Sequence, residues 1–264
     1  MASVESPSAI TPDEITRADF DSLLAQYPAL LEDVSLAKGQ GKPGTKTLNE
    51  LDKYRYIDAP QSFGPANRRR PMGLDEVKLL VEWKLRHGTF RPKLMALVAS
   101  NPPSEVQRCI QDALQAYEVS ASTALKTLTT LRGIGPATAS LLLAVHHQAR
   151  AIFFSDEAFR WLCRGGDSRA PIRYTVAEYD VLCERAAVVA SRLGVEPVEL
   201  EKVAYVLMRS DAGLVRPSRK KEKVENEEKK EKKKTLVEKR ASSPVDMASE
   251  LRRSKRLKGT AKAN

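Results

Sequence analysis

Residues 123–145 read TALKTLTTLRGIGPATASLLLAV, and the predicted fold is built outward from this stretch. Leu128 and Leu131 continue the apolar face of a first predicted helix. Residues 132–135 interrupt that spacing. Pro136 then suits the first position of a second helix, because its missing N–H would have no partner there in any case. The pattern predicts two helices joined by a tight glycine turn.

The glycines of this turn point to contact with an anion. Gly133 and Gly135 permit positive φ and let another molecule approach the backbone closely. N–H groups at such a turn, beside a helix N-terminus, favour a phosphate oxygen. We therefore predict that the phosphate-contacting residues are Gly133, Ile134, Gly135 and Thr138. Backbone contacts of this kind position a nucleic acid and do not read its bases.

Helix signals recur along the chain, whereas strand signals are nearly absent. Capping boxes, which mark helix starts, occur at Thr11–Glu14, Thr47–Glu50, Ser104–Gln107 and Thr175–Glu178. Apolar stripes at helical spacing run from Val77 to Leu85 before Gly88, from Val176 to Ala186 before Gly194, and from Leu200 to Met208. We expect an all-α domain of eight to ten helices, with residues 172–174 as at most a short extended link.

The charge divides the chain into a neutral body and a basic tail. Of 44 Lys and Arg and 34 Asp and Glu, residues 216–264 hold 18 and 8, which leaves 26 of each sign in residues 1–215. The tail is too poor in apolar residues to offset chain entropy. We expect a helical and flexible segment at 1–46, an α-domain at 47–215 and a disordered tail at 216–264. Residues 53–132 carry a net +6, so one face could meet an anionic partner.

Two basic clusters in the tail are typical of nuclear import signals. Their members are Lys232, Lys233, Lys234, Arg252, Arg253, Lys255 and Arg256. We expect a nuclear protein that binds an import receptor. The alternative is a solubilising tail that no receptor binds.

Composition argues against several other classes of protein. There is no run of 18 or more apolar residues, and residues 1–14 are unlike a secretory signal. Cys109, Cys163 and Cys183 form no CxxC pair, which argues against a disulfide framework, a zinc finger or a four-cysteine cluster. We expect no metal site made of side chains. His87, His146 and His147 are expected to be helix-end or surface residues.

The hairpin also carries a family resemblance. L-x-G-I-G-x-x-T-A at residues 131–139 resembles the helix-hairpin-helix motif of DNA repair proteins, in particular the base-excision DNA glycosylase superfamily. In that superfamily an aspartate at a helix start follows the hairpin by some twenty residues, and Asp156 lies 23 residues after Gly133. Residues 47–213, with Trp83 and residues 90–92, resemble the Amun-like group of nuclear proteins.

This resemblance implies a glycosylase-like α-domain that binds double-stranded DNA in base-excision repair. Asp156 would stabilise the positive charge that develops on the sugar of a flipped nucleotide, or orient the attacking water. Phe154 and Trp161 would offer stacking faces to the extruded base, with core packing as the alternative. No cofactor is required. The resemblance does imply a monovalent cation on backbone carbonyls of Thr129, Leu131 and Ile134.

Three departures from the family pattern leave alternatives open. The position of the Schiff-base lysine of bifunctional members is Ala137, so any enzyme would be a monofunctional glycosylase without lyase activity. Alignment on residues 159–160 puts Ser155, not Asp156, at the acidic position. Residues 155–157 also fit a plain helix start. The candidates are a DNA-binding module, a glycosylase, and an all-α domain that binds other proteins.

Overall fold

The computed structural model describes residues 10–38, 44–66 and 70–210, and within them every regular element is a helix. The α-helices are α1 (Arg17–Leu24), α2 (Tyr27–Ala37), α3 (Leu48–Lys53), α4 (Ala59–Phe63), α5 (Leu74–His87), α6 (Leu94–Ala99), α7 (Pro103–Tyr117), α8 (Ala121–Leu128), α9 (Pro136–His146), α10 (Asp156–Arg164), α11 (Val176–Leu193) and α12 (Pro197–Ser210). A π-helical turn, η1 (Tyr54–Asp58), joins α3 to α4. The all-α prediction is confirmed, although the described part holds more helices than expected because several are short.

Local sequence signals located the ends of some helices well. Thr47 and Thr175 cap α3 and α11 through complete capping boxes, and Gly194 ends α11 in the left-handed region at φ 66°. The helix starts predicted from the capping boxes at Thr11 and Ser104 were wrong. Thr11 precedes a turn, and α1 starts later at the cap Thr16, whose hydroxyl accepts the N–H of Asp19. α7 starts at Pro103, so Ser104 already lies inside its first turn.

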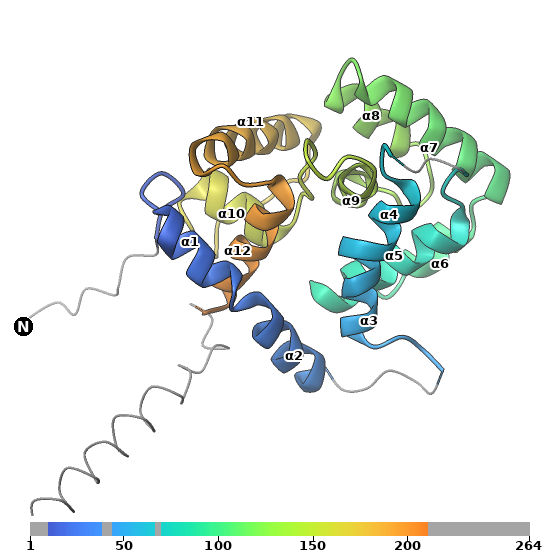
Figure 1. The fold of residues 1–264 in the computed structure, drawn as a ribbon. Helices are drawn as coiled ribbons and strands as arrows, with labels where there is room; N and C mark the ends of the chain where they lie inside the picture. The colour runs from blue at the N-terminus through green and yellow to red at the C-terminus, as the bar shows by residue number, and fades with distance from the viewer. Residues whose placement is uncertain (1–9, 39–43, 67–69, 211–264) are drawn as a thin grey trace, which may run out of the picture. The chain divides into compact units, whose positions relative to one another are not determined.

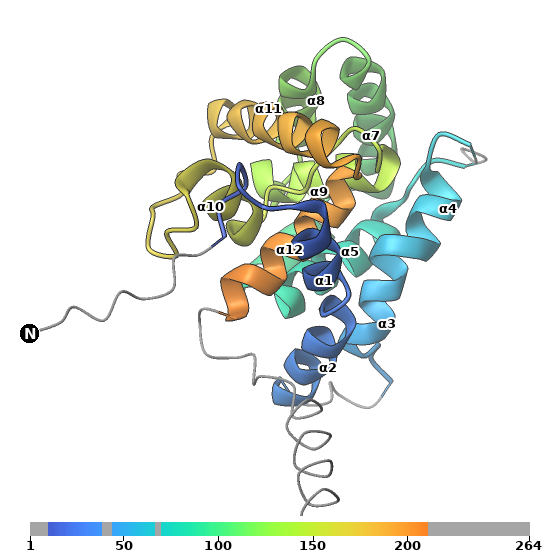
Figure 2. The same cartoon turned by 60° about the vertical axis from the view of Figure 1, so that its left-hand side comes forward.

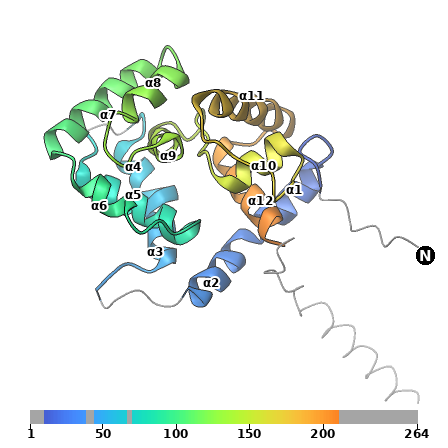
Figure 3. The same cartoon turned by 180° about the vertical axis from the view of Figure 1, so that it is seen from behind.

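The helices gather on two sides of α9. Helices α3 to α8 lie on one side and α1, α10, α11 and α12 on the other, as Figures 1 and 3 show. α9 packs against α4, α5 and α8, and α10 packs against both α11 and α12. Nine consecutive residues of α9, from Thr138 to His146, are buried, because neighbours cover this helix all round.

The N-terminal segment is part of the same folded unit. α1 packs on α12, and α2 contacts both α3 and α12 (Figure 2). Arg192 of α11 donates to the carbonyls of Pro12 and Ile15 at 2.7 and 3.0 Å. Trp161 of α10 donates its indole N–H to the carbonyl of Ile10 at 3.0 Å. Residues 10–16 are therefore fastened across α10 and α11.

The chain divides into two units, Met1–Val215 and Arg216–Asn264. The second unit, with both basic clusters, lies outside the described residues. Among the helices that are described, none has the length and apolar character needed to cross a membrane. Of the cysteines, Cys109 is buried, while Cys163 and Cys183 are half-buried, and all three are free thiols.

Candidate functional site

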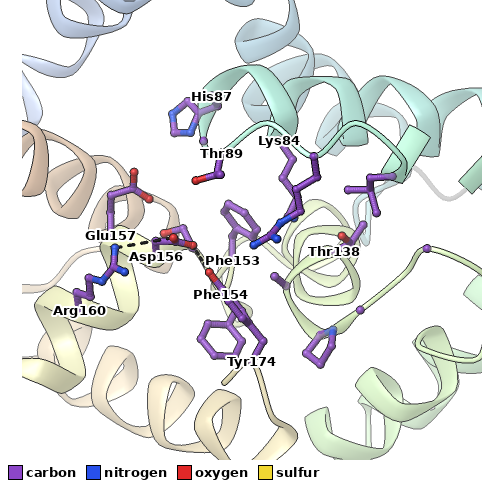
Figure 4. A pocket seen from close by; sticks show the side chains of 18 residues that line it. Lys84, His87, Thr89, Thr138, Phe153, Phe154, Asp156, Glu157, Arg160 and Tyr174 are labelled. Carbon is purple, nitrogen blue, oxygen red and sulfur yellow. Dashed lines mark hydrogen bonds and ion pairs between the residues drawn. The ribbon is translucent and has the colours of Figure 1, made fainter. Parts of the chain in front are cut away.

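A pocket of about 410 Å³ lies where the glycine turn, α5 and α10 meet. Its size falls within the range of roughly 300–1,000 Å³ that is usual for ligand sites. Figure 4 shows side chains from these elements and from Tyr174 around one hollow. Its lining is Lys84, His87, Gly88, Thr89, Arg91, Leu94, Gly133, Gly135, Pro136, Ala137, Thr138, Phe153, Phe154, Ser155, Asp156, Glu157, Arg160 and Tyr174.

The two glycines of the turn have different roles. Gly133 has φ +77°, and a Cβ there would lie 2.9 Å from Cβ of Leu97 and 3.0 Å from the backbone N of Val98. It therefore lets the turn pack against α6. Gly135 has φ −88° and caps α9, and a Cβ there would meet nothing within 4 Å. No internal contact requires a glycine at position 135.

The turn is held from outside by one side chain. Asn101, between α6 and α7, donates to the carbonyl of Arg132 and accepts its N–H, both at 2.8 Å. Among the described residues, the backbone N–H groups of Gly135 and Ala137 find no hydrogen-bond acceptor. Since both residues line the pocket, these two donors are available to an anion at the N-terminus of α9.

The segment before Asp156 is held in place by hydrogen bonds to its backbone. The N–H of Phe153 donates to Oε1 of Glu201 on α12 at 2.7 Å. The N–H of Phe154 donates to Oγ of Ser140 on α9 at 2.9 Å. Because both acceptors come from other helices, the segment's approach to α10 is set by tertiary contacts.

Asp156 is the first residue of α10 and faces the pocket. Tyr174 Oη donates to one of its carboxylate oxygens, and Arg160 Nη1 lies 3.8 Å from the other. About a third of the Asp156 side chain, 36%, is exposed. Ser155 caps the helix by accepting the N–H of Ala158 at 3.0 Å. Ser155 is therefore the cap of α10, and the adjacent residue Asp156 places its carboxylate in the pocket.

Tyr174 adopts an unusual backbone conformation. Its φ is +55°, the one positive φ of a non-glycine residue in the described part of the chain. Such a conformation costs about 1–3 kcal/mol and persists where the surroundings impose it, often at functional sites. Its ring packs 5.3 Å from that of Phe154. Burial and the neighbouring Asp156 carboxylate both raise the pKa of Tyr174, which keeps its hydroxyl a donor.

Positive charge in the pocket is only partly compensated. Neither Lys84 nor Arg91 forms an ion pair within the described residues, although both line the pocket. Lys84 is half-buried on α5, and burial, with help from Arg91, lowers the pKa of its ammonium group. Lys84 feels the Asp156 carboxylate, but neither cation has an ion-pair partner among the described residues. Beside the free N–H groups of the turn, the two cations favour an anionic ligand.

A second carboxylate in the pocket wall, that of Glu157, is neutralised by an ion pair. Glu157 Oε1 lies 3.4 Å from Nη2 of Arg209 on α12, and its side chain is 16% exposed. Burial raises the pKa of Glu157, while Arg209 opposes the shift. The same Arg209 nitrogen donates to the carbonyl of His87 at 3.0 Å, and Tyr205 Oη donates to that carbonyl at 3.2 Å. This group ties the ends of α5 and α12 together.

The three histidines lie at helix ends, as expected, but none of them lies at the surface. His87 is 5% exposed and stacks between Trp83 and Tyr205, with ring centroids 4.5 and 3.9 Å away. His146 and His147 are also buried. Helix-end positions suggested solvent, but neighbouring helices cover these ends. Among the described residues, no three His, Cys, Asp or Glu side chains group closely enough to hold a metal ion.

The remaining predicted site residues fall into two groups. Ile134 and Thr138 are 3% exposed each, so the turn would contact a phosphate through backbone rather than through these side chains. Phe154 is fully buried in the pocket wall, against Phe159 and Tyr174. Trp161 is 1% exposed and does not line the pocket, so the structure does not bring it to the site.

Sequence reasoning missed the residues that shape the site from a distance. Tyr174, Ser140, Glu201 and Asn101 each hold a backbone or carboxylate group of the pocket or its turn. None lies in a motif, and residues 172–174 read only as a link. No local signal could have found them, because each acts across a gap in sequence.

Comparison with known proteins does not identify a family for this chain. No protein-family model, curated protein or solved structure matches the chain. The site is therefore interpreted from its own geometry.

Proposed function

We propose that this protein binds double-stranded DNA through the turn at residues 133–135 and admits one extruded nucleotide to the pocket. In this proposal it is a DNA-glycosylase-like protein of the helix-hairpin-helix class. The observation that carries the proposal is the unpaired charge of Lys84 and Arg91 beside the free N–H groups of Gly135 and Ala137. Phosphate is the anion that fits both, since it accepts hydrogen bonds on several oxygens.

The pocket also holds a carboxylate suited to base release. Loss of a base from a nucleotide leaves positive charge on the sugar, which a fixed carboxylate stabilises. Asp156 is held by Tyr174 and Arg160 and is still partly exposed to the pocket. In this reaction the base departs with the electrons of the glycosidic bond, and water adds to C1′ and gives a proton to the carboxylate or to solvent. We propose Asp156 for this step.

Two further parts of the proposal rest on the family resemblance. The carbonyl of Leu131 accepts the N–H of Ile134 at 3.1 Å and keeps a second lone pair. We propose that this carbonyl holds a monovalent cation together with the carbonyls of Thr129 and Ile134. The basic tail would carry the protein into the nucleus through an import receptor.

Gly135→Ala tests DNA docking without a folding defect, because its Cβ meets nothing in the protein. The chain ending at Val215 keeps every described helix and removes the basic tail. In this shortened chain, the methyl group of Gly135→Ala would keep a phosphate oxygen away from the neighbouring N–H groups. We therefore expect Gly135→Ala to lose about 1.5–3 kcal/mol of affinity for a duplex with an abasic-site analogue, the value of one hydrogen bond to a charged group. Titrations at two salt concentrations measure it. Equal binding by variant and parent would exclude docking through the turn.

Asp156→Asn tests the catalytic step separately. We expect base release from damaged duplexes to be abolished and DNA affinity to be preserved, since the amide keeps the shape and loses the charge. Glu14→Gln, on the distant N-terminal segment, is the matched control. If the body binds no DNA at all, an all-α domain for protein partners becomes the better description of this fold.

A further inference from the structure

A chain of hydrogen bonds leads from the pocket into the interior of the protein. His87, the last residue of α5, lines the same hollow as Asp156 (Figure 4). Its Nε2 lies 3.2 Å from the hydroxyl of Tyr27 on α2. That hydroxyl donates to Oδ1 of Asp52 on α3 at 2.7 Å. Three side chains from three helices therefore form one continuous path from the pocket to a buried carboxylate.

The direction of these hydrogen bonds follows from the number of protons. Oδ1 of Asp52 also accepts the indole N–H of Trp83 at 2.9 Å, so this oxygen acts as an acceptor. A phenol has one proton, and Tyr27 gives it to Asp52. The Tyr27 oxygen can then only accept from His87. His87 therefore carries its proton on Nε2 and keeps a lone pair on Nδ1.

The Nδ1 atom of His87 is open to the pocket. It finds no hydrogen-bond partner among the described residues, yet it is not one of the fully buried polar atoms that lack a partner. The ring is held between Trp83 and Tyr205, with centroids 4.5 and 3.9 Å away. Because His87 lines the pocket, a water molecule there can donate to this fixed nitrogen.

We infer that His87, Tyr27 and Asp52 form a proton relay that activates water in the proposed base-release reaction. This inference rests on the proposed function and names the base that takes the water's proton. Nδ1 of His87 accepts that proton as the water oxygen bonds to C1′. In the same step the Nε2 proton passes to the Tyr27 oxygen and the Tyr27 proton passes to Asp52. One proton leaves the water, and Asp52 becomes neutral.

Such a relay suits a histidine that stays uncharged. Burial, reinforced by nearby cations, lowers the pKa of His87 well below its usual value, so an imidazolium is disfavoured. In the relay the ring gains a proton on one nitrogen and loses a proton from the other, and it carries no net charge afterwards. Burial also raises the pKa of Asp52, which makes this carboxylate a better final acceptor.

The relay divides the work between two carboxylates. Asp156 stabilises the sugar only while it is charged, and a proton from the water would remove that charge. Asp52 lies behind Tyr27 and His87, so it can take the proton without touching the substrate. Before the reaction, the neighbouring Lys202 and Arg55 favour the charged form of Asp52.

The tautomer of His87 tests the relay without DNA. Nitrogen NMR of the full chain with isotope-labelled histidine shows which ring nitrogen carries the proton, and His87→Gln identifies the signals of His87. We expect a neutral ring with its proton on Nε2. Tyr27→Phe removes the acceptor and should reduce the population of this tautomer. A proton on Nδ1 would overturn the inference, because that nitrogen could not accept from water.

Asp52→Asn tests the chemistry and keeps the geometry, since the amide oxygen still accepts from Tyr27 and Trp83. The probes are duplexes with one uracil, hypoxanthine or methylated purine, and base release is measured in a single turnover. We expect release to slow by about 10²- to 10⁴-fold, the usual contribution of a general base. DNA affinity and the His87 tautomer should not change. Asp33→Asn, at an exposed position of α2, is the matched control and should behave as wild type.

Tyr27→Phe interrupts the same path one link earlier, and the double variant shows whether the links act as a unit. We expect Tyr27→Phe, Asp52→Asn and the double variant to release base at similar rates, because a relay that is broken once transfers no proton. Losses that multiply in the double variant would mean that Tyr27 and Asp52 act separately, and this result would overturn the relay.

The outcomes separate the relay from the proposed function. If wild type and Asp52→Asn release base at the same rate, the relay is excluded, while Asp156 keeps its proposed role. If wild type releases no base from any of these duplexes, base release is excluded and the relay with it. Docking through the turn then still stands or falls with the binding of Gly135→Ala.

Discussion

Ser140 Oγ, in the middle of α9, accepts the backbone N–H of Phe154 at 2.9 Å. Both residues are fully buried, so no water replaces this bond. The same hydroxyl donates to the carbonyl of Ala137 at 3.0 Å. One side chain thus connects the first turn of α9, which borders the glycine turn, to the segment that ends at Asp156.

We predict that Ser140→Ala costs about 1–3 kcal/mol of folding free energy, since it leaves the Phe154 N–H buried without an acceptor. Urea unfolding measures the loss, and hydrogen exchange of the Phe154 amide should accelerate. Ser62→Ala is the control, because its hydroxyl bonds to the Asp58 carbonyl at an exposed site. Equal costs at the two serines would contradict this account of the pocket segment.

Three glycine-to-alanine variants should rank in a defined order of stability. Gly133→Ala combines positive φ with contacts of 2.9 and 3.0 Å, so we expect a loss above the roughly 1–3 kcal/mol of a strained backbone alone. Gly165→Ala has φ +61° and open space, which leaves the backbone strain only. Gly135→Ala has neither, and its stability should match wild type. Thermal unfolding of all three checks the order, and a costly Gly135→Ala would refute it.

Acid should destabilise the fold through His87. Burial, reinforced by Arg209, Lys38 and Arg55, lowers the pKa of His87 well below its usual 6.5. Below about pH 6.5, His87 is therefore protonated in the unfolded state but stays neutral in the folded state. The free energy of unfolding consequently decreases as the pH falls below about 6.5. We predict a lower free energy of unfolding at about pH 5.5 than at about pH 7.5.

The His87→Gln variant isolates this contribution. Burial raises the pKa of Glu157 and of Glu201, so these groups favour the folded state on acidification and partly mask the slope. The comparison is therefore between the two pH profiles. Parallel profiles for wild type and His87→Gln would show that His87 does not carry the acid sensitivity.

Removal of either partner of the buried Arg55–Glu201 ion pair should destabilise the fold. Arg55 Nη2 lies 3.3 Å from Oε2 of Glu201, and the side chains are 0% and 3% exposed. Glu201→Ala strands the Arg55 charge and also removes the acceptor of the Phe153 N–H. We predict a loss of about 3–5 kcal/mol. The double variant Arg55→Met, Glu201→Leu should recover part of it, and a double-mutant cycle by urea unfolding measures the coupling. Additive effects would mean that the two groups do not act as a pair.

The sequence by itself determined the helical class, the limits of the longer helices and the glycine turn. Caps, apolar spacing, Pro136 and Gly194 act within one or two helical turns, so the chain displays them directly. The resemblance of residues 131–139 to a helix-hairpin-helix motif also singled out Asp156 as a candidate. The predicted helix starts at Thr11 and Ser104 failed because neighbouring residues can also begin a helix, and a local pattern does not show which of them does.

Only the tertiary structure decided what surrounds Asp156 and which aromatic residues are available. Lys84 and Tyr174 reach one site from α5 and from a link, and Ser140 supports it from α9. Their polar groups interact strongly because burial removes water between them. His87 and Trp161 are buried while Phe90 is exposed, and the sequence around each residue does not show this difference. Exposure and the balance of charge are properties of packed neighbours, and those neighbours lie far apart in the chain.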